Sequence, residues 1–317
     1  MSAPSNHRET ISSLIFLSPF LILFAIFLIF PIIYSFYLSF FDASKGFGLS
    51  NLHFVGFENY VNLLGFHFEE GAFKLNDPAF WWSIAVTFIY GGLSIPLGIG
   101  ASLMLALLLH NKLAGRNFFR SAFFLPNILD MLVVGVIWTL IYAPKYGALA
   151  QITTYFFGGD QFFNNGGMLS SPFTALPAVI IAMVLKGAGF GMVLFLAALQ
   201  NIPEAVYEAA DIDGASKWDQ FWLITLPLLK PILFFMGVTG IIGSLNAFTE
   251  IYAMTAGGPQ IVLGGETLGS TQVAGYYLYK QFDGGRHGYA AAISYVLLAI
   301  TLLLTWLQKK FVAGDKA

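Results

Sequence analysis

The chain has 317 residues, of which 57% are hydrophobic and only 10% are charged. Soluble domains carry about a quarter charged residues, so this composition and a mean hydropathy of +0.74 exclude an ordinary soluble protein. The net charge of −2 gives no indication of nucleic-acid binding, and the absence of cysteine excludes disulfides and thiol chemistry.

Apolar runs are the dominant pattern along the chain. A helix needs about 20 apolar residues to cross roughly 30 Å of hydrocarbon. Six predicted spans meet that length, at residues 13–38, 82–109, 121–143, 174–199, 231–255 and 288–308. The first run is longer than the apolar segment of a cleaved signal peptide, so we expect it to remain as a span. We therefore predict an all-α, polytopic transmembrane helical bundle that forms a single domain over residues 1–317.

Two segments between the spans have recognisable composition. Residues 58–64 are expected to form a short interfacial helix in the first external loop. Residues 144–173 are rich in Gly and Asn and are expected to form a flexible external loop.

The distribution of Lys and Arg between the spans predicts the orientation. Nine of these residues fall on the side that holds both termini, and five fall on the other side, in longer loops. Because basic residues are enriched in cytoplasmic loops, both termini are expected to be cytoplasmic.

The loop between the fourth and fifth spans predicts a helix, a turn and a second short helix. Pro203 suits the first turn of a helix, and Glu204 is favourable at the positive end of the helix dipole. Gly214 can adopt the left-handed conformation that ends a helix. Ser216 and Asp219 have the spacing of a capping box for the second helix.

The first of these helices carries an acidic edge. Glu204, Glu208 and Asp211 lie at i, i+4 and i+7, so they share one face and repel one another weakly. Small residues, including Ala209, line the neighbouring face. This arrangement suits insertion into a groove with a basic rim, and the alternative is a solvated acidic loop that only connects two spans.

The same loop resembles the EAA loop of ABC importer permeases. The matching residues are Glu208, Ala209, Ala210, Gly214, Ile224, Leu226 and Pro227. The resemblance implies that the segment around residues 200–230 is a cytoplasmic coupling loop that docks into a cleft on a separate ATPase. It also implies the fold of a type I ABC importer permease.

Other stretches are similar to the maltose-type, sugar-importing branch of that family, in its first permease subunit. They are residues 55–60, 77–81, 119–126 and 255–259. Three features depart from the pattern: residues 65–76 are extra, Val86 replaces a usual Asn, and the external loop containing residues 157–171 is long. The resemblance leaves open which sugar is carried and whether this subunit or its partner forms the main substrate site.

Polar residues inside the spans are candidates for a substrate path. In the predicted fifth span, Thr239, Gly243, Asn246 and Glu250 recur every three or four residues and would form one stripe, with Tyr252 nearby. Ionisable groups within a span are costly and usually face a cavity or a partner. A sugar needs amide and carboxylate acceptors, so the stripe suits a sugar, although an interhelix hydrogen-bonded pair is the alternative.

The predicted fourth span carries one basic residue. Lys186 lies in mid-span with Phe190 one turn further on, and it could pair with Glu250 or Asp130 or contact substrate. Gly187 and Gly191 form a small-xxx-small pattern that favours close helix packing.

The expected function is a non-catalytic permease that imports a sugar by alternating access in the bacterial inner membrane. The chain lacks a phosphate-binding G-x-x-x-x-G-K-[ST] motif, so we expect no cofactor in it, with ATP and Mg²⁺ bound by the partner ATPase. The implied partners are a second permease subunit, two ATPase subunits, an external sugar-binding protein and membrane lipid. The alternatives are an ion-coupled secondary transporter, a permease for another small polar solute, and a membrane-embedded enzyme, for which no catalytic cluster appears.

Overall fold

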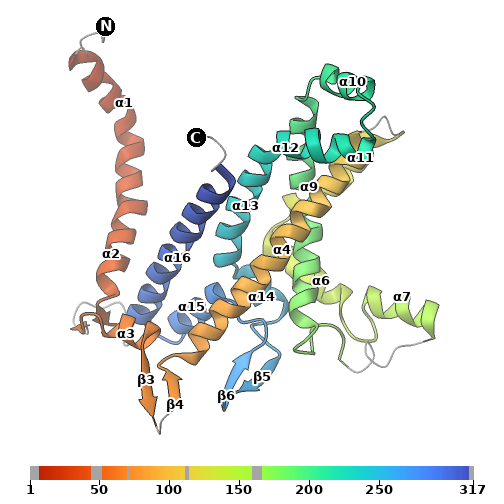
Figure 1. The fold of residues 1–317 in the computed structure, drawn as a ribbon. Helices are drawn as coiled ribbons and strands as arrows, with labels where there is room; N and C mark the ends of the chain where they lie inside the picture. The colour runs from red at the N-terminus through yellow and green to blue at the C-terminus, as the bar shows by residue number, and fades with distance from the viewer. Residues whose placement is uncertain (1–6, 44–51, 70–71, 111–113, 159–165, 314–317) are drawn as a thin grey trace. The chain divides into compact units, whose positions relative to one another are not determined.

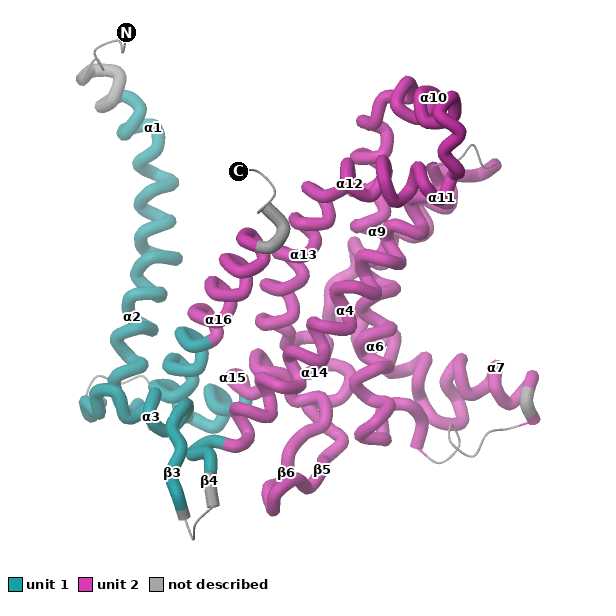
Figure 2. The backbone as a smooth tube through the Cα atoms, viewed as in Figure 1, with its two compact units in different colours: residues 1–77, 280–296 teal, residues 78–279, 297–317 magenta. Residues whose placement is uncertain are grey.

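A computed structural model describes the chain except at residues 1–6, 44–51, 70–71, 111–113, 159–165 and 314–317. Helices dominate, as the apolar runs predict. The chain divides into two compact units, residues 1–77 with 280–296 and residues 78–279 with 297–317 (Figure 2).

The first unit begins with a long apolar helix. Residues 12–38 form a span-length helical segment whose most apolar window buries no residue. A π-helical turn at Ala25–Ile29 lies just before Pro31, which has no N–H to donate to the usual i−4 carbonyl. The elements of this part of the chain are α1 (His7–Phe24), η1 (Ala25–Ile29), α2 (Phe30–Leu38), β1 (Phe41–Asp42), β2 (His53–Phe54), α3 (Glu58–Leu64), β3 (Phe66–Glu69) and β4 (Ala72–Leu75). Helix α3 confirms the short helix expected there.

The second unit is built on three helices that pack along one another, α4, α9 and α13 (Figure 1). Its core includes Tyr90, Val179 and Ile251, which are at most 5% exposed. The elements of the rest of the chain are α4 (Pro78–His110), α5 (Arg116–Ile128), α6 (Met131–Ile141), α7 (Ala148–Phe157), α9 (Ala175–Gln200), α10 (Glu204–Ile212), α11 (Lys217–Gln220), η3 (Phe221–Thr225), α12 (Leu226–Leu228), α13 (Lys230–Leu245), α14 (Thr249–Met254), β5 (Gln260–Leu263), β6 (Glu266–Gly269), α15 (Ala274–Asp283) and α16 (His287–Ala313).

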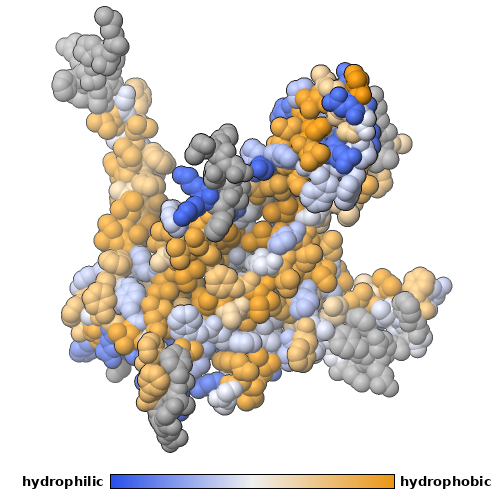
Figure 3. Space-filling view, in the orientation of Figure 1, coloured by the Kyte–Doolittle hydropathy of each residue, from blue (hydrophilic) through white to orange (hydrophobic). Residues whose placement is uncertain are grey.

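Among the described residues, four helical segments are long and apolar enough to cross a membrane without a break, namely Ser12–Leu38, Pro78–His110, Ala175–Gln200 and His287–Lys310. Two bent helix pairs raise the total to six if each pair is one span, α5 with α6 at 105° and the α11–α12 segment with α13 at 62°. Figure 3 shows hydrophobic residues covering α1 and α2.

The predicted third span, 121–143, is not a single helix. The chain is extended at Leu129, and Asp130 then caps α6 by accepting a hydrogen bond from the Leu132 N–H at 2.9 Å. An N-cap carboxylate satisfies a free donor at a helix start, so it favours a new helix here.

The predicted fifth span, 231–255, is also interrupted. Helix α13 ends at Leu245, and α14 begins only at Thr249. The amide of Asn246 donates to the carbonyl of Ile242 at 2.8 Å. Such side-chain bonds to backbone carbonyls compete with continuation of the helix. The segment 144–173, expected to be a flexible external loop, contains the helix α7 at Ala148–Phe157, and its residues 159–165 lie outside the described residues.

The two ends of the second unit differ in character (Figure 1). Helices α10 and α11 lie at one end of α4 and α9, whereas α7 and the β5–β6 hairpin lie at the other end. The 33-residue α4 and 26-residue α9 run between them. The loop predicted to be cytoplasmic, residues 200–230, therefore lies at the opposite end of this unit from α7 and the β5–β6 hairpin.

Helix α9 packs closely against its neighbours at Gly189 and Gly191, whereas the predicted pair was Gly187 and Gly191. A Cβ on Gly189 would lie 1.9 Å from the Phe123 carbonyl oxygen, and one on Gly191 would lie 2.3 Å from the Ser102 hydroxyl oxygen. A Cβ on Gly187 would meet no atom within 4 Å. The close approach to α5 thus depends on Gly189 rather than on Gly187.

These two glycines provide a matched test of packing. We expect Gly189→Ala to destabilise the protein by about 1–3 kcal/mol or more, because the added methyl group overlaps the backbone of α5. Gly187→Ala should be neutral or should stabilise α9 by up to about 1 kcal/mol, because alanine has the higher helix propensity. Thermal unfolding in the same detergent measures both, and equal melting temperatures would contradict this packing.

Candidate functional site

The predicted helix, turn and helix are confirmed at residues 204–220. Helix α10 begins at Glu204, directly after Pro203. The chain reverses at Gly214, whose φ of +77° is left-handed, and the Ala215 N–H donates to the Ala210 carbonyl at 2.9 Å. Ser216 and Asp219 form the complete capping box of α11. The turn is therefore closed by backbone and side-chain bonds together.

The acidic edge differs from the predicted one at its third member. Lys217 donates to the Asp211 carboxylate at 3.0 Å, and the Gln220 amide donates to the same carboxylate at 2.5 Å. These hydrogen bonds lower the pKa of Asp211, so it stays ionised and locally neutralised. In the described part of the chain no ion pair or hydrogen bond engages the side chain of Glu204 or Glu208. The three acids are therefore not equivalent: Asp211 is held by Lys217 and Gln220, whereas the carboxylates of Glu204 and Glu208 have no partner among the described residues.

Exposed apolar side chains lie on the same helical segment of the chain as these carboxylates. Figure 3 shows hydrophobic and hydrophilic residues side by side at this end of the second unit. Ile212 is 87% exposed and Trp218 is 68% exposed, while Ala210 turns inward and is buried. Leu223 is also exposed, on the π-helical turn η3, whereas Ile224 and Leu226 are half-buried and Pro227 is exposed. We call the exposed and half-buried residues among these, with Ala205, Val206, Glu208 and Ala209, the coupling surface, after the role that the sequence resemblance implies for this loop.

The coupling surface is joined to the helices behind it. The Tyr207 and Thr225 hydroxyls are 2.9 Å apart, which ties α10 to η3. The exposed side chains of Trp218, Trp222 and Leu223 were not predicted as part of this surface. The sequence feature that indicates such a surface is the pair of tryptophans, Trp218 and Trp222, in a segment predicted to lie outside the bilayer.

A cavity of about 420 Å³ lies among α4, α9, α13 and α14. Five of the proposed substrate-path positions line it: Lys186, Phe190, Thr239, Gly243 and Glu250. Asn246 and Tyr252 do not. The predicted stripe does not lie on one continuous helix, because α13 ends at Leu245 and α14 begins at Thr249. Asn246 falls in this break and is not in the cavity lining, whereas Glu250 on α14 is.

Glu250 is the buried acid of the cavity wall. It is 7% exposed and accepts a hydrogen bond from the Tyr90 hydroxyl at 3.0 Å. Neither expected ion pair of Lys186 forms, since within the described residues it is not within 4.0 Å of the Glu250 or Asp130 carboxylates. Lys186 is half-buried and contributes a cationic donor to the same cavity.

Helix α4 supplies a polar face that the sequence analysis missed. Tyr90, Ser94, Gly98 and Ser102 all line the cavity at intervals of four residues. That period places them on one side of a helix. The four-residue spacing is visible in the sequence, but it is a weak indication of a polar face because glycine is common in membrane helices.

Tyr252 belongs to an aromatic cluster instead. Its ring centroid lies 5.5 Å from that of Phe248 and 5.6 Å from that of Tyr279, and Phe248 also contacts Tyr276. These rings pack α14 against α15.

Similar proteins support the assignment of this architecture. The chain is 34% identical to the probable ABC transporter permease protein YurN of Bacillus subtilis (strain 168), over 98% of this chain and 99% of that protein. It is 32% identical to the lactose transport system permease protein LacF of Rhizobium radiobacter, over 93% and 91%. The trehalose/maltose transport system permease protein MalF of Thermococcus litoralis is 31% identical, over 96% and 95%.

A solved structure has the same fold. It is a bacterial ABC transporter involved in the import of the acidic polysaccharide alginate, with a TM-score of 0.75, 23% identity and 98% coverage of both chains. The family model described as "Binding-protein-dependent transport system inner membrane component" matches residues 94–314. The chain therefore belongs to the family of inner-membrane components of binding-protein-dependent transport systems.

Proposed function

We propose that this protein is the membrane-spanning permease subunit of an ATP-driven importer that carries a sugar inward by alternating access. Family membership supports the transport role, and the lactose and trehalose/maltose permeases among its relatives support a sugar as cargo. The subunit itself is non-catalytic, and a partner ATPase hydrolyses ATP.

The coupling surface is the observation that carries this proposal. A short exposed helix with free carboxylates, apolar neighbours and a rigid left-handed turn has the properties of a docking element. A contiguous patch of exposed apolar side chains outside the bilayer usually marks a binding surface. A secondary transporter driven by an ion gradient has no need of such an element.

The cavity is proposed as the substrate path. A sugar presents many hydroxyl groups, and Glu250 can accept hydrogen bonds from them. Phe190 offers an apolar ring face, and Thr239, Ser94 and Lys186 offer further polar contacts. The ligand-sized volume is suited to about one or two sugar rings.

The proposed assembly lies in the bacterial inner membrane with both termini in the cytoplasm. It contains this chain, a second permease subunit, two ATPase subunits and an external sugar-binding protein. A solved relative of the fold is described in complex with an alginate pentasaccharide-bound periplasmic protein, which supports the external partner.

Glu208→Lys tests the coupling role. Its carboxylate is exposed and without a partner in the described residues, so a basic residue of the ATPase can form a charge-assisted bond with it, contributing roughly 1.5–3 kcal/mol. We expect Glu208→Lys to abolish uptake and to reduce co-purification of the ATPase subunits.

Glu266→Lys is the matched control, because Glu266 is an exposed acid at the opposite end of the second unit. It should leave ATPase co-purification unchanged. Full sugar-stimulated ATPase activity in Glu208→Lys would refute the coupling role.

Glu250→Leu tests the substrate path. Loss of the acceptor should raise the apparent KM for sugar uptake at least about tenfold, while the ATPase subunits remain assembled. If Glu250 served only to satisfy the buried Tyr90 hydroxyl, then Tyr90→Phe in the same protein would remove that need. Recovery of normal uptake by the Tyr90→Phe/Glu250→Leu double variant would therefore reject contact with sugar, and persistence of the defect would support it.

A further inference from the structure

Lys186 is the one cation among the described residues that line the cavity. It is the twelfth residue of the 26-residue helix α9, so it lies near the middle of that span. Ionisable side chains at this depth are rare and costly, and they normally pair with an opposite charge or belong to a substrate pathway. The position of Lys186 therefore calls for a counter-charge.

The chain has two acids at membrane depth, and neither pairs with Lys186. Glu250 and Asp130 are the acidic residues within the six predicted spans. The Asp130 carboxylate caps α6, and the Glu250 carboxylate accepts a hydrogen bond from the Tyr90 hydroxyl at 3.0 Å. In the part of the chain that the structure describes, no ion pair and no hydrogen bond engages the ammonium group of Lys186.

Glu250 and Lys186 also lie at different levels of the cavity. Helices α4 and α9 run side by side in the same direction (Figure 1), and a Cβ on Gly191 would lie 2.3 Å from the Ser102 hydroxyl oxygen. The 12 residues from Tyr90 to Ser102 correspond to about 18 Å of helix. The five residues from Lys186 to Gly191 correspond to about 8 Å. The backbone of Lys186 is therefore about 10 Å along the cavity from that of Tyr90, the partner of Glu250.

A substrate that fills this cavity of about 420 Å³ must displace water from Lys186. A neutral sugar offers only hydroxyl oxygens in exchange, which leaves a buried cation without a counter-charge. A carboxylate on the sugar supplies that charge and accepts a charge-assisted hydrogen bond, which is roughly twice as strong as a neutral one. The cavity therefore favours a sugar with a carboxylate over its neutral counterpart.

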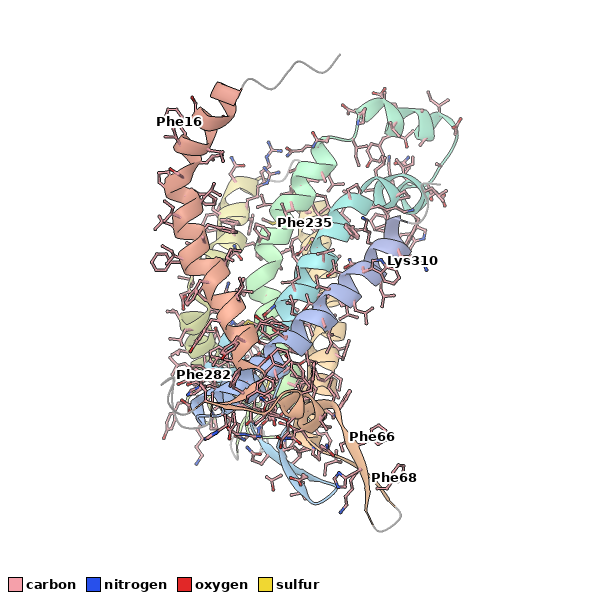
Figure 4. The ribbon with its side chains drawn as sticks, turned by 90° about the vertical axis from the view of Figure 1, so that its left-hand side faces the viewer. Phe16, Phe66, Phe68, Phe235, Phe282 and Lys310 are labelled. Carbon is pink, nitrogen blue, oxygen red and sulfur yellow. The ribbon has the colours of Figure 1, made fainter. Side chains whose placement is uncertain are left out.

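The rest of the lining suits the uncharged part of such a sugar. Phe190 lies one turn from Lys186 on α9, where its ring can pack on the face of a sugar ring. Thr239 lies on α13, which runs beside α9 (Figure 4), and its hydroxyl can bond to those of the sugar. Because a carboxylate is attracted to Lys186 and repelled by Glu250, the two charged residues also determine which way round the sugar binds.

We propose that the cargo of this protein is an acidic sugar, and that Lys186 is the specificity-determining residue that binds its carboxylate in the cavity. This inference rests on the proposed function, because it takes the cavity as the substrate path. A uronic acid has the required chemistry, since it combines a ring that carries hydroxyl groups with one carboxylate.

Sugar binding to the purified complex, without the external binding protein, tests the role of Lys186. Saturation-transfer NMR can follow weak ligands, and the probes are glucuronate and galacturonate, with glucose and galactose as their neutral counterparts. The unmodified complex should bind each uronate at least about tenfold more tightly than the matched hexose. Lys186→Met should remove that preference with little change in hexose binding. Lys186→Arg should keep most of the preference, because it keeps the charge.

Lys310→Met is the matched control. Lys310 is an exposed cation in the last turn of α16 (Figure 4) and is absent from the cavity lining, so the uronate preference should not change. Equal affinity of the unmodified complex for a uronate and its matched hexose, or an unchanged preference in Lys186→Met, would overturn the proposal. Loss of the second permease subunit from the Lys186→Met complex would also overturn it, because Lys186 would then pair with an acid of that subunit.

Uptake into proteoliposomes that contain the whole complex, with the external binding protein added, separates this inference from the proposed function. ATP-dependent uptake of a labelled uronate that falls at least about tenfold in Lys186→Met would support the inference. ATP-dependent uptake confined to the neutral hexoses would overturn the acidic cargo and leave the proposed function intact. If neither kind of sugar is taken up with ATP, the proposed function fails together with the inference.

Discussion

Hydrocarbon offers no hydrogen bonds to a polypeptide, and this constraint determines the architecture of the chain. Every backbone N–H and C=O inside the bilayer must find its partner within the protein, so the spans are helical. Non-helical backbone at membrane depth is tolerated only where protein covers it or where it lines a water-filled cavity. The break after α13 is covered by protein, because Gly275 of α15 lies so close that a Cβ there would be 2.4 Å from the Ala247 carbonyl oxygen. The break redirects the chain so that Glu250 enters the cavity wall.

The helices that lead into and out of the loop connect the coupling surface to the cavity. Helix α9 leads directly into α10, and the segment after α11 continues through η3 and α12 into α13. Both α9 and α13 line the cavity. The hydroxyl contact between Tyr207 and Thr225 and the pinned Asp211 make the intervening loop a rigid connection. In the proposed mechanism, displacement of the loop by an ATPase therefore moves two walls of the cavity together.

Local chemistry explains which features could be predicted from the sequence. The positions of the apolar helices, α3 and the capped turn at Ser216 depend on runs of apolar residues and on spacings of three or four residues, which the sequence displays directly. The left-handed Gly214 belongs to the same class, because few other residues tolerate that conformation. The helix, turn and helix at residues 204–220 could be predicted largely for this reason.

Features that depend on tertiary contacts were predicted less well. The interruptions at Asp130 and Asn246 lie within apolar runs whose composition is that of a continuous helix. A polar residue there either caps a helix or faces a cavity, and only the packing of neighbouring helices decides between these outcomes. The β3–β4 hairpin was missed as well, because alternating Phe66, His67 and Phe68 form too short a pattern. Lys217 as the partner of Asp211 required the turn geometry.

The central claim is that transport through this chain is driven by ATP and requires an external binding protein. Sugar uptake into proteoliposomes that contain the whole complex, with ATP inside and binding protein outside, tests it most directly. The account predicts uptake that needs both components and continues when a protonophore abolishes the ion gradient. Uptake that proceeds without ATP and stops with the protonophore would contradict it.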